Sequence, residues 1–189
     1  MSVSGSIGSS ARAAVRRTVP IEQVANLILR LPSRRLRDAF IRSVLRWPMG
    51  DDVHIGRGVT LQGTSGITLG SRVFIHRHSE LDLRGGLSIG DDVSIAPHCR
   101  ILTADHDADS PTREYRERPV VIGNRTWLGT GACLLPGTTV AEGTVVGAGA
   151  VAHGTLDEFS IYVGNPARRV RDRARDAQLR LAGTMRRFQ

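Results

Sequence analysis

The sequence predicts an all-β fold, a three-sided parallel β-helix of about five coils with one long excursion loop, N-terminal helices and a C-terminal helix. Two observations predict it. Aliphatic residues recur at every sixth position from Ile122 onward, with glycines in the gaps between them. The 189-residue chain also holds 21 glycines while only 4% of it is aromatic. That composition disfavours an ordinary layered core and favours regular backbone with small residues near turns.

The six-residue period defines the coil. Each aliphatic position is preceded by a small residue two positions earlier, and i−2 and i face the same side of a short strand. Six residues turn an α-helix through about 600°, so no helical face could hold this stripe. A two-residue strand followed by a turn can hold it, and three such units close a coil of about 18 residues. The aliphatic and small positions are Ile122, Leu128, Leu134, Val140, Val146 and Ala152, with Thr126, Ala132, Thr138, Thr144 and Ala150.

The earlier half of the chain keeps this period with interruptions. The period starts at Ile55, and two extra residues fall around Gly63–Gly66 and again at Gly85-Gly86. The register stops after Ile101, where residues 106–120, HDADSPTREYRERPV, contain almost nothing aliphatic. We expect this segment to leave the prism as a loop, and long polar loops in compact domains are often functional.

Helical patterns flank the prism, so we expect three parts: a basic helical cap over residues 1–50, the β-helix over 51–167 and a basic helix over 168–189. Within the cap, apolar spacing predicts one helix broken near Pro20 and a second after Pro32-Ser33. Caps of this kind would cover the sheet edges that a prism otherwise exposes.

The net charge of +8 is unevenly placed, and all 26 basic residues are Arg. Residues 1–50 and 166–189 are basic, whereas the middle is acidic. A basic chain raises nucleic acid as a partner, but here two solvated Arg-rich ends explain the charge, so no nucleic acid partner is expected. The chain has two cysteines, no apolar run of the roughly 18 residues that a span needs, and no secretion pattern, which predict a cytoplasmic protein.

Two unusual side chains should face outward. Trp127 directly precedes an inward leucine, and an outward tryptophan on a flat face usually meets a ligand or a neighbouring chain. His106 has the same phase at the root of the loop, between Asp105 and Asp107, although Asp105 itself falls on an inward position. A histidine beside carboxylates can be held in one tautomer with a basic free nitrogen. The other histidines show no metal-ligand spacing, so no metal is expected.

The segments IGNRTWLGTGACLLPGTTVAEGTVVGAGAV and VGNPARRVR resemble the hexapeptide-repeat acyltransferases, and ILTADHDADSP resembles their maltose, galactoside and nodulation-type O-acetyltransferase branch. The likeness covers about residues 51–172 and is greatest to acetyltransferases of exopolysaccharide and lipopolysaccharide clusters. It implies left-handed coils, a homotrimer with active sites between adjacent prisms, and acetyl-CoA as co-substrate.

The resemblance also implies roles for individual residues. His106 would be the general base that deprotonates a hydroxyl of a sugar or polysaccharide precursor, and the Thr130 N–H would stabilise the oxyanion. His76 stands where relatives place an acceptor-binding Asn, and it is either an acceptor contact or a plain turn residue. The residues expected to bind CoA are Trp127, Gly129, Thr130, Ala148, Arg168 and Arg171.

Other functions stay open at this point. The same reaction could act on serine, an amino sugar or an antibiotic. A γ-type carbonic anhydrase on the same fold would need three histidines around one Zn²⁺ between chains. A non-catalytic assembly or nucleic-acid-binding module would use the basic ends.

Overall fold

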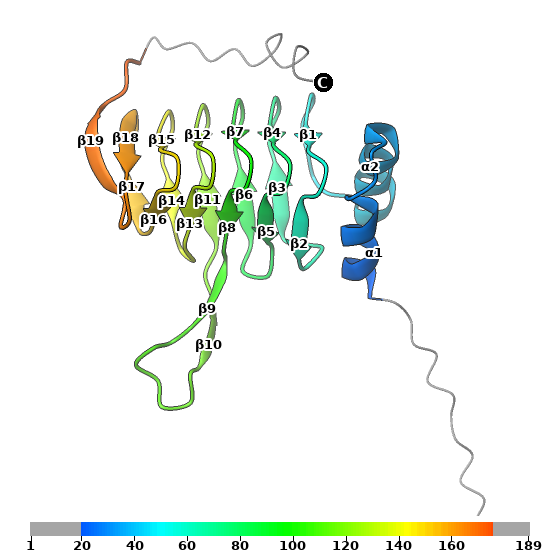
Figure 1. Cartoon of the computed structure of the whole chain (residues 1–189), viewed down its shortest axis with the longest axis horizontal. Coiled ribbons are helices and arrows are strands. Elements are labelled where there is room, and N and C mark those ends of the chain that lie inside the picture. The colour runs from blue at the N-terminus through cyan, green and yellow to red at the C-terminus, as the bar shows by residue number, and fades with distance from the viewer. Residues whose placement is uncertain (1–19, 176–189) are drawn as a thin grey trace, which may run out of the picture.

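The computed structural model describes residues 20–175, which form a β-solenoid of about five coils with helices at its N-terminal end (Figure 1). Three sheets make the sides of the prism, and their strands are parallel except for β19 at the end of sheet 1. Sheet 1 contains, in spatial order, β1 (His54–Ile55), β4 (Phe74–Ile75), β7 (Ser94–Ile95), β12 (Trp127–Leu128), β15 (Val145–Val146), β18 (Ser160–Val163) and β19 (Arg168–Asp172). Sheet 2 contains β2 (Thr60–Gln62), β5 (Glu80–Asp82), β8 (Arg100–Ile101), β13 (Cys133–Leu134) and β16 (Val151–Ala152). Sheet 3 contains β3 (Ile67–Leu69), β6 (Leu87–Ile89), β11 (Val120–Ile122), β14 (Thr139–Val140) and β17 (Thr155–Leu156).

The expected aliphatic ladders fill the prism. Residues at equivalent positions of successive coils are direct partners in the strand register, and none of them is more than 5% exposed. The small residues expected to face inward, Thr126, Ala132, Thr138, Thr144 and Ala150, are buried as well. The three ladders are Ile55, Ile75, Ile95, Leu128 and Val146; Leu61, Leu81, Ile101, Leu134 and Ala152; and Leu69, Ile89, Ile122, Val140 and Leu156. Burying one such side chain stabilises the fold by about 1.5–3 kcal/mol.

The coils differ in length as the interrupted period predicted. Ile55 pairs with Ile75 and Ile75 with Ile95, so the first two coils are 20 residues long. Leu128 pairs with Val146, which gives an 18-residue coil. The extra residues of the early coils lie in wider turns near Gly63 and Gly86.

The N-terminal helices cover one end of the prism, as expected. α1 (Ile21–Ile28) starts directly after Pro20, and α2 (Arg34–Phe40) starts after Ser33 and continues into a short π-helix, η1 (Ile41–Leu45). The Asn26 side chain accepts a hydrogen bond from Leu61 N at 2.7 Å and donates one to Leu61 O at 3.0 Å. It therefore satisfies the free edge of β2 as a neighbouring strand would.

The C-terminal helix expected over 168–189 is wrong where the structure describes it. Arg168–Asp172 forms β19, which pairs antiparallel with β18 after the turn at Gly164. The outer edge of β18 needs hydrogen-bond partners, and this need overrides the local helical pattern. Residues 176–189 lie outside the described part of the chain, as do residues 1–19 of the cap.

The excursion loop is an antiparallel hairpin that projects from the prism (Figure 1). It comprises β9 (Ala104–His106), β10 (Tyr115–Glu117) and the turn between them. β8 of sheet 2 precedes it and β11 of sheet 3 follows it, so the hairpin leaves at the edge between these two sheets, opposite sheet 1. No helix within residues 20–175 is long and apolar enough to cross a membrane.

Candidate active site

Trp127 lies on the outer face of sheet 1, as its position in the hexad predicts. The residue is 46% exposed. Its register partners are Ser94 on one side and Val145 on the other, and the row continues through Ile161 to Arg171. Because residues opposite each other in a ladder share one face, these residues form a continuous outward row along the prism. Within this row an aromatic ring and a guanidinium are separated by two aliphatic side chains.

Thr130 and Ala148 lie at one corner of adjacent coils, just beyond β12 and β15. Both are exposed, and the Thr130 carbonyl accepts a hydrogen bond from Gly149 N at 2.9 Å. The Thr130 N–H donates to no acceptor within residues 20–175, so it is free to bind a ligand oxygen. A Cβ on Gly129 would lie 2.6 Å from Ala148 N, so the stacking of the coils alone already requires glycine there.

Arg168 and Arg171 extend this surface at the far end of sheet 1. Each guanidinium donates only to a backbone carbonyl, Ala167 O and Asp172 O respectively, both at 3.1 Å. Neither makes an ion pair with any described residue, whereas the intervening Arg169 is paired with Asp157 and Asp172. Two exposed guanidiniums without counter-ions in the described chain can bind phosphate groups.

His106 lies at the end of β9 with one ring nitrogen already engaged. Its Nδ1 is 2.8 Å from the Arg113 carbonyl oxygen. A carbonyl can only accept, so Nδ1 carries the proton, and in the neutral ring Nε2 is the unprotonated nitrogen. Arg113 has a φ of 51°, in the left-handed region, and its own N–H bonds Ser110 O at 3.0 Å. The tight turn thus points this carbonyl at the imidazole.

Neither flanking aspartate orients His106. Asp105 accepts hydrogen bonds from Arg116 Nε at 3.0 Å and from Arg118, and Asp107 pairs with Arg116 Nη1 at 3.0 Å. The inward position that the hexad register gives Asp105 is therefore wrong, because the chain has already left the prism in β9. Burial favours the neutral carboxyl of Asp105, but its two arginine partners outweigh this and lower its pKa.

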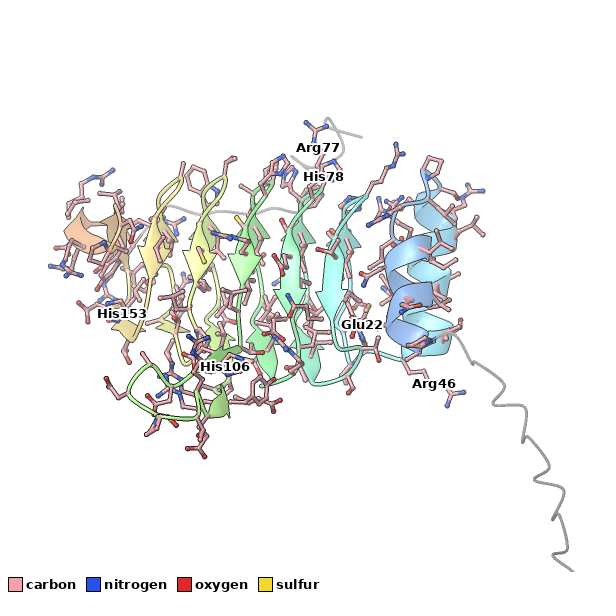
Figure 2. The ribbon with its side chains drawn as sticks, turned by 60° about the horizontal axis from the view of Figure 1, so that its bottom comes forward. Glu22, Arg46, Arg77, His78, His106 and His153 are labelled. Atoms are coloured by element: carbon pink, nitrogen blue, oxygen red, sulfur yellow. The ribbon has the colours of Figure 1, made fainter. Side chains whose placement is uncertain are left out.

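Trp127 and His106 do not share a cleft within one chain. Trp127 faces outward from sheet 1, whereas the hairpin starts at the opposite edge, between sheets 2 and 3. In Figure 2, His106 lies on the hairpin side of the prism, and Arg77 and His78 lie on the other side. The Thr130 corner is on the same edge of sheet 1 as Arg77 and His78.

His76 belongs to a small aromatic cluster at the start of sheet 1. Phe74 stacks on His54 with ring centroids 4.4 Å apart and meets His76 edge-on at 4.3 Å. Burial, aided by Arg34, lowers the pKa of His54 to about 4, and burial with Arg77 lowers the pKa of His76. Both rings are therefore neutral near pH 7. β7 separates this cluster from Trp127 in the sheet.

The sequence did not single out two groups that lie against His106, the Arg113 carbonyl and the Tyr115 ring. The rings of Tyr115 and His106 are 5.7 Å apart in an edge-on arrangement. Tyr115 is one of only two tyrosines in the chain, which is a weak signal for its importance. Within residues 20–175 of one chain, no three His, Cys, Asp or Glu side chains are placed to share a metal ion.

Comparisons with known proteins show what the chain is similar to. The family model "Bacterial transferase hexapeptide (six repeats)" matches residues 119–154. The probable acetyltransferase Rv3034c of Mycobacterium tuberculosis is 35% identical over 131 residues, which cover 66% of this chain and 44% of that protein. The putative colanic acid biosynthesis acetyltransferase WcaF of Escherichia coli is 30% identical over 135 residues, covering 71% and 74%. The chain thus spans less than half of the first relative and about three quarters of the second.

A solved structure shares both the fold and part of the sequence. It is a point mutant of AntD, an N-acyltransferase from Bacillus cereus, in complex with dTDP and coenzyme A. The TM-score is 0.63 at 25% sequence identity, and the match covers 68% of this chain and 74% of AntD.

Proposed function

Because the chain belongs to the hexapeptide-repeat acetyltransferase family, we propose that it transfers an acetyl group from acetyl-CoA directly to a hydroxyl of a sugar or polysaccharide precursor. The observation that carries the proposal is the His106 Nδ1–Arg113 carbonyl hydrogen bond of 2.8 Å. It leaves Nε2 as a free base on an exposed hairpin, where an acceptor can reach it.

His106 is the general base of this reaction. An alcohol is a very weak acid and attacks a thioester slowly unless its proton is removed during attack, and a positioned base accelerates attack by roughly 10²–10⁴-fold. The new C–O bond forms as the acceptor proton moves to Nε2. The C–S bond then breaks, and the imidazolium returns the proton to the leaving thiolate. The Arg113 carbonyl stabilises the imidazolium in between.

The Thr130 N–H is the proposed oxyanion donor, because it has no protein acceptor in the described chain and backbone donors of this kind stabilise tetrahedral intermediates. Trp127, Gly129 and Ala148 border the proposed path of the pantetheine arm. Arg168 and Arg171 bind the nucleotide phosphates at the far end of the row. At the usual strand spacing, β19 lies roughly 14 Å from β12 along the prism, a distance that suits a long, linear ligand. His76 is the proposed acceptor contact.

The site needs two copies of the chain. Sheet 1 of one prism and the hairpin of another must meet, because these surfaces face opposite ways in a single chain. A homotrimer, in which three equivalent interfaces close a ring, gives three such sites. Light scattering should report three times the 20.5 kDa chain mass. A monomer at micromolar concentration would contradict the proposed assembly.

A panel of acceptors tests the reaction. The protein is incubated with acetyl-CoA and with neutral sugars, amino sugars, serine or an aminoglycoside, and thiol release and product mass are followed. We expect O-acetylation of a sugar hydroxyl, and its loss in His106→Ala. A protein that releases no thiol with any acceptor would contradict the proposal.

An amino sugar is the second candidate acceptor. It is favoured by the likeness to AntD, an N-acyltransferase whose structure holds dTDP together with coenzyme A. The base and the oxyanion donor would serve an amine equally well. The two candidates differ in the product, because an amide survives mild alkaline treatment whereas an O-acetyl ester is hydrolysed.

A further inference from the structure

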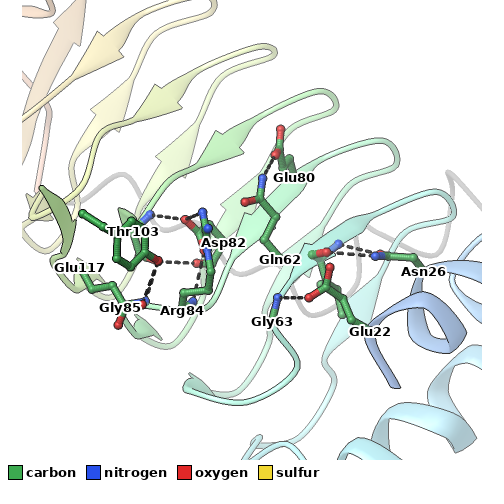
Figure 3. A network of polar contacts seen from close by, with 12 residues as sticks. Glu22, Asn26, Gln62, Gly63, Glu80, Asp82, Arg84, Gly85, Thr103 and Glu117 are labelled. Carbon is green, nitrogen blue, oxygen red and sulfur yellow. Dashed lines mark hydrogen bonds and ion pairs between the residues drawn. The ribbon is translucent and has the colours of Figure 1, made fainter. Parts of the chain in front are cut away.

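A buried carboxylate lies one coil below the hairpin. The side chain of Asp82, at the end of β5, is 1% exposed. Arg84 binds it with two parallel hydrogen bonds of 2.8 and 3.0 Å, and Thr103 N donates a third at 3.1 Å (Figure 3). Burial would raise the pKa of Asp82, but these bonds outweigh it and lower the pKa. A buried charge with this many partners fixes the side chains around it.

This carboxylate fixes both ends of the hairpin. Thr103, the residue before β9, donates from Oγ1 to the Asp82 carbonyl at 3.1 Å and accepts from Gly85 N at 2.9 Å. The Thr103 carbonyl in turn accepts from Arg118 N at 2.7 Å, directly after β10. A Cβ on Gly85 would collide with the Thr103 carbonyl, so only glycine permits this approach.

Arg84 extends from this anchor to the catalytic end of the hairpin. Its guanidinium carbon lies 5.7 Å from the centroid of the Tyr115 ring, within cation–π range. Tyr115 is held at its other end by a 2.8 Å hydrogen bond to Glu117 and presents its ring to His106. The contacts therefore run without a gap from buried Asp82 through Arg84 and Tyr115 to the imidazole.

We propose that Arg84, held by Asp82 and acting through Tyr115, is a positioning residue that fixes the orientation of the His106 ring. The inference rests on the proposed function of His106 as the base. The Arg113 carbonyl selects the tautomer while Nδ1 faces it, and the Tyr115 ring keeps the imidazole from turning away from that carbonyl. The hairpin has no aliphatic core that could do this, since β9 and β10 are exposed or half-buried throughout.

Two variants remove the support at different points. Arg84→Ala removes the cation beneath Tyr115, and Tyr115→Leu removes the ring while leaving the Asp82 pair intact. Arg84→Lys keeps the positive charge but loses the planar two-bond pairing. The matched control is Arg72→Ala, because Arg72 makes the same kind of two-bond pair with Asp92, at 2.6 and 2.7 Å, without touching the hairpin.

Steady-state kinetics and histidine NMR read out the effect. We expect Arg84→Ala and Tyr115→Leu to lower kcat about 10-fold with an unchanged KM for acetyl-CoA, the pattern of misorientation rather than lost binding. Arg84→Lys should recover part of the loss, and Arg72→Ala should behave as wild type. In ¹⁵N spectra of the neutral ring, wild-type His106 should be the Nδ1–H tautomer, and both variants should shift toward a mixture of tautomers.

The outcomes separate this inference from the proposed function. Wild-type kcat and an unchanged His106 tautomer in both variants would overturn the positioning role while leaving the transferase intact. A raised acceptor KM at constant kcat would also overturn it, by making Arg84 an acceptor contact. If the wild type transfers no acetyl group, the proposed function fails, and the NMR comparison alone decides whether Arg84 holds the His106 ring.

Discussion

The prism and the hairpin are built from the same chain by opposite means. Inside the prism, aliphatic side chains repeat in three ladders, and each coil makes nearly the same contacts as the next. The hairpin of β9 and β10 has no buried aliphatic residue and is held by ion pairs, backbone hydrogen bonds and one aromatic contact. Stability is therefore spread over the repeats, whereas the proposed chemistry depends on a few single contacts. Substitutions in the two regions should fail in different ways.

The largest effect should follow from removing His106, the proposed base. His106→Ala should reduce acetyl transfer by roughly 10²–10⁴-fold, because proton removal from the acceptor is lost. Its melting temperature should stay close to that of the wild type, since the ring is exposed. Thiol release and calorimetry measure the two quantities. His78→Ala, which removes another exposed histidine, is the control, and an equal loss of activity in both variants would remove the special role of His106.

A substitution in the prism should show the reverse pattern. Leu128 is fully buried between Ile95 and Val146. Leu128→Ala should lower the free energy of unfolding by about 2–5 kcal/mol through lost burial and a residual cavity. Urea denaturation measures it. Val121→Ala, on the exposed face of sheet 3, should change stability by less than about 0.5 kcal/mol. Comparable losses in both would mean that the ladders do not carry the stability.

Trp127→Ala tests the comparison from the other side. Trp127 lies on the prism, but its loss should weaken the binding of acetyl-CoA and leave the fold stable. We expect the KM for acetyl-CoA to rise about 10-fold, equivalent to about 1.4 kcal/mol of lost contact, with a small change in stability because the ring is exposed. Isothermal titration with CoA gives an independent reading. Unchanged affinity together with a disrupted oligomer would assign the ring to the contact between chains instead.

An effect of similar or smaller size concerns the pH dependence of stability at the capped end of the prism. Folding lowers the pKa of His54 from 6.5 to about 4, so the unfolded chain binds the extra proton between these values. Stability should therefore be fully present above pH 6.5 and decline as the pH falls toward 4, by about 1–2 kcal/mol after allowance for partial exposure. In His54→Phe, which keeps an aromatic partner for Phe74, this decline should flatten. Denaturation midpoints at pH 7 and pH 4.5 test it, and an unaltered slope would contradict it.

The prism could be predicted from the sequence because its information is periodic. Every aliphatic position of the six-residue repeat, from Ile55 to Ala152, is buried. Trp127 faces outward, as its position directly before an inward leucine predicts. The wider turns of the early coils could also be predicted, because the six-residue period is interrupted there by two extra residues next to glycines. Each coil of a repeat requires inward aliphatic residues at the same positions, so the pattern remains recognisable when one coil is irregular.

The contacts around His106 could not be predicted in this way. Its partner is a backbone carbonyl, which depends on the positive φ of Arg113 and not on a side-chain pattern. Arg84 belongs to an earlier coil and reaches the hairpin only because the solenoid stacks the two levels. The prediction of a C-terminal helix was wrong for a related reason. The local pattern of this segment suits a helix, but Arg168–Asp172 pairs as a strand with the open edge of β18.

The amide of Asn26 has a consequence for how copies of this chain can meet. A stack of parallel coils offers hydrogen-bonding groups at its ends, and unprotected ends of this kind join head to tail into fibres. The Asn26 side chain occupies both backbone polar groups of Leu61. The edge of β2 therefore has no free hydrogen-bonding group at Leu61 for a strand of another molecule. Axial polymerisation is blocked there, and the flanks remain as the surfaces through which two molecules can associate.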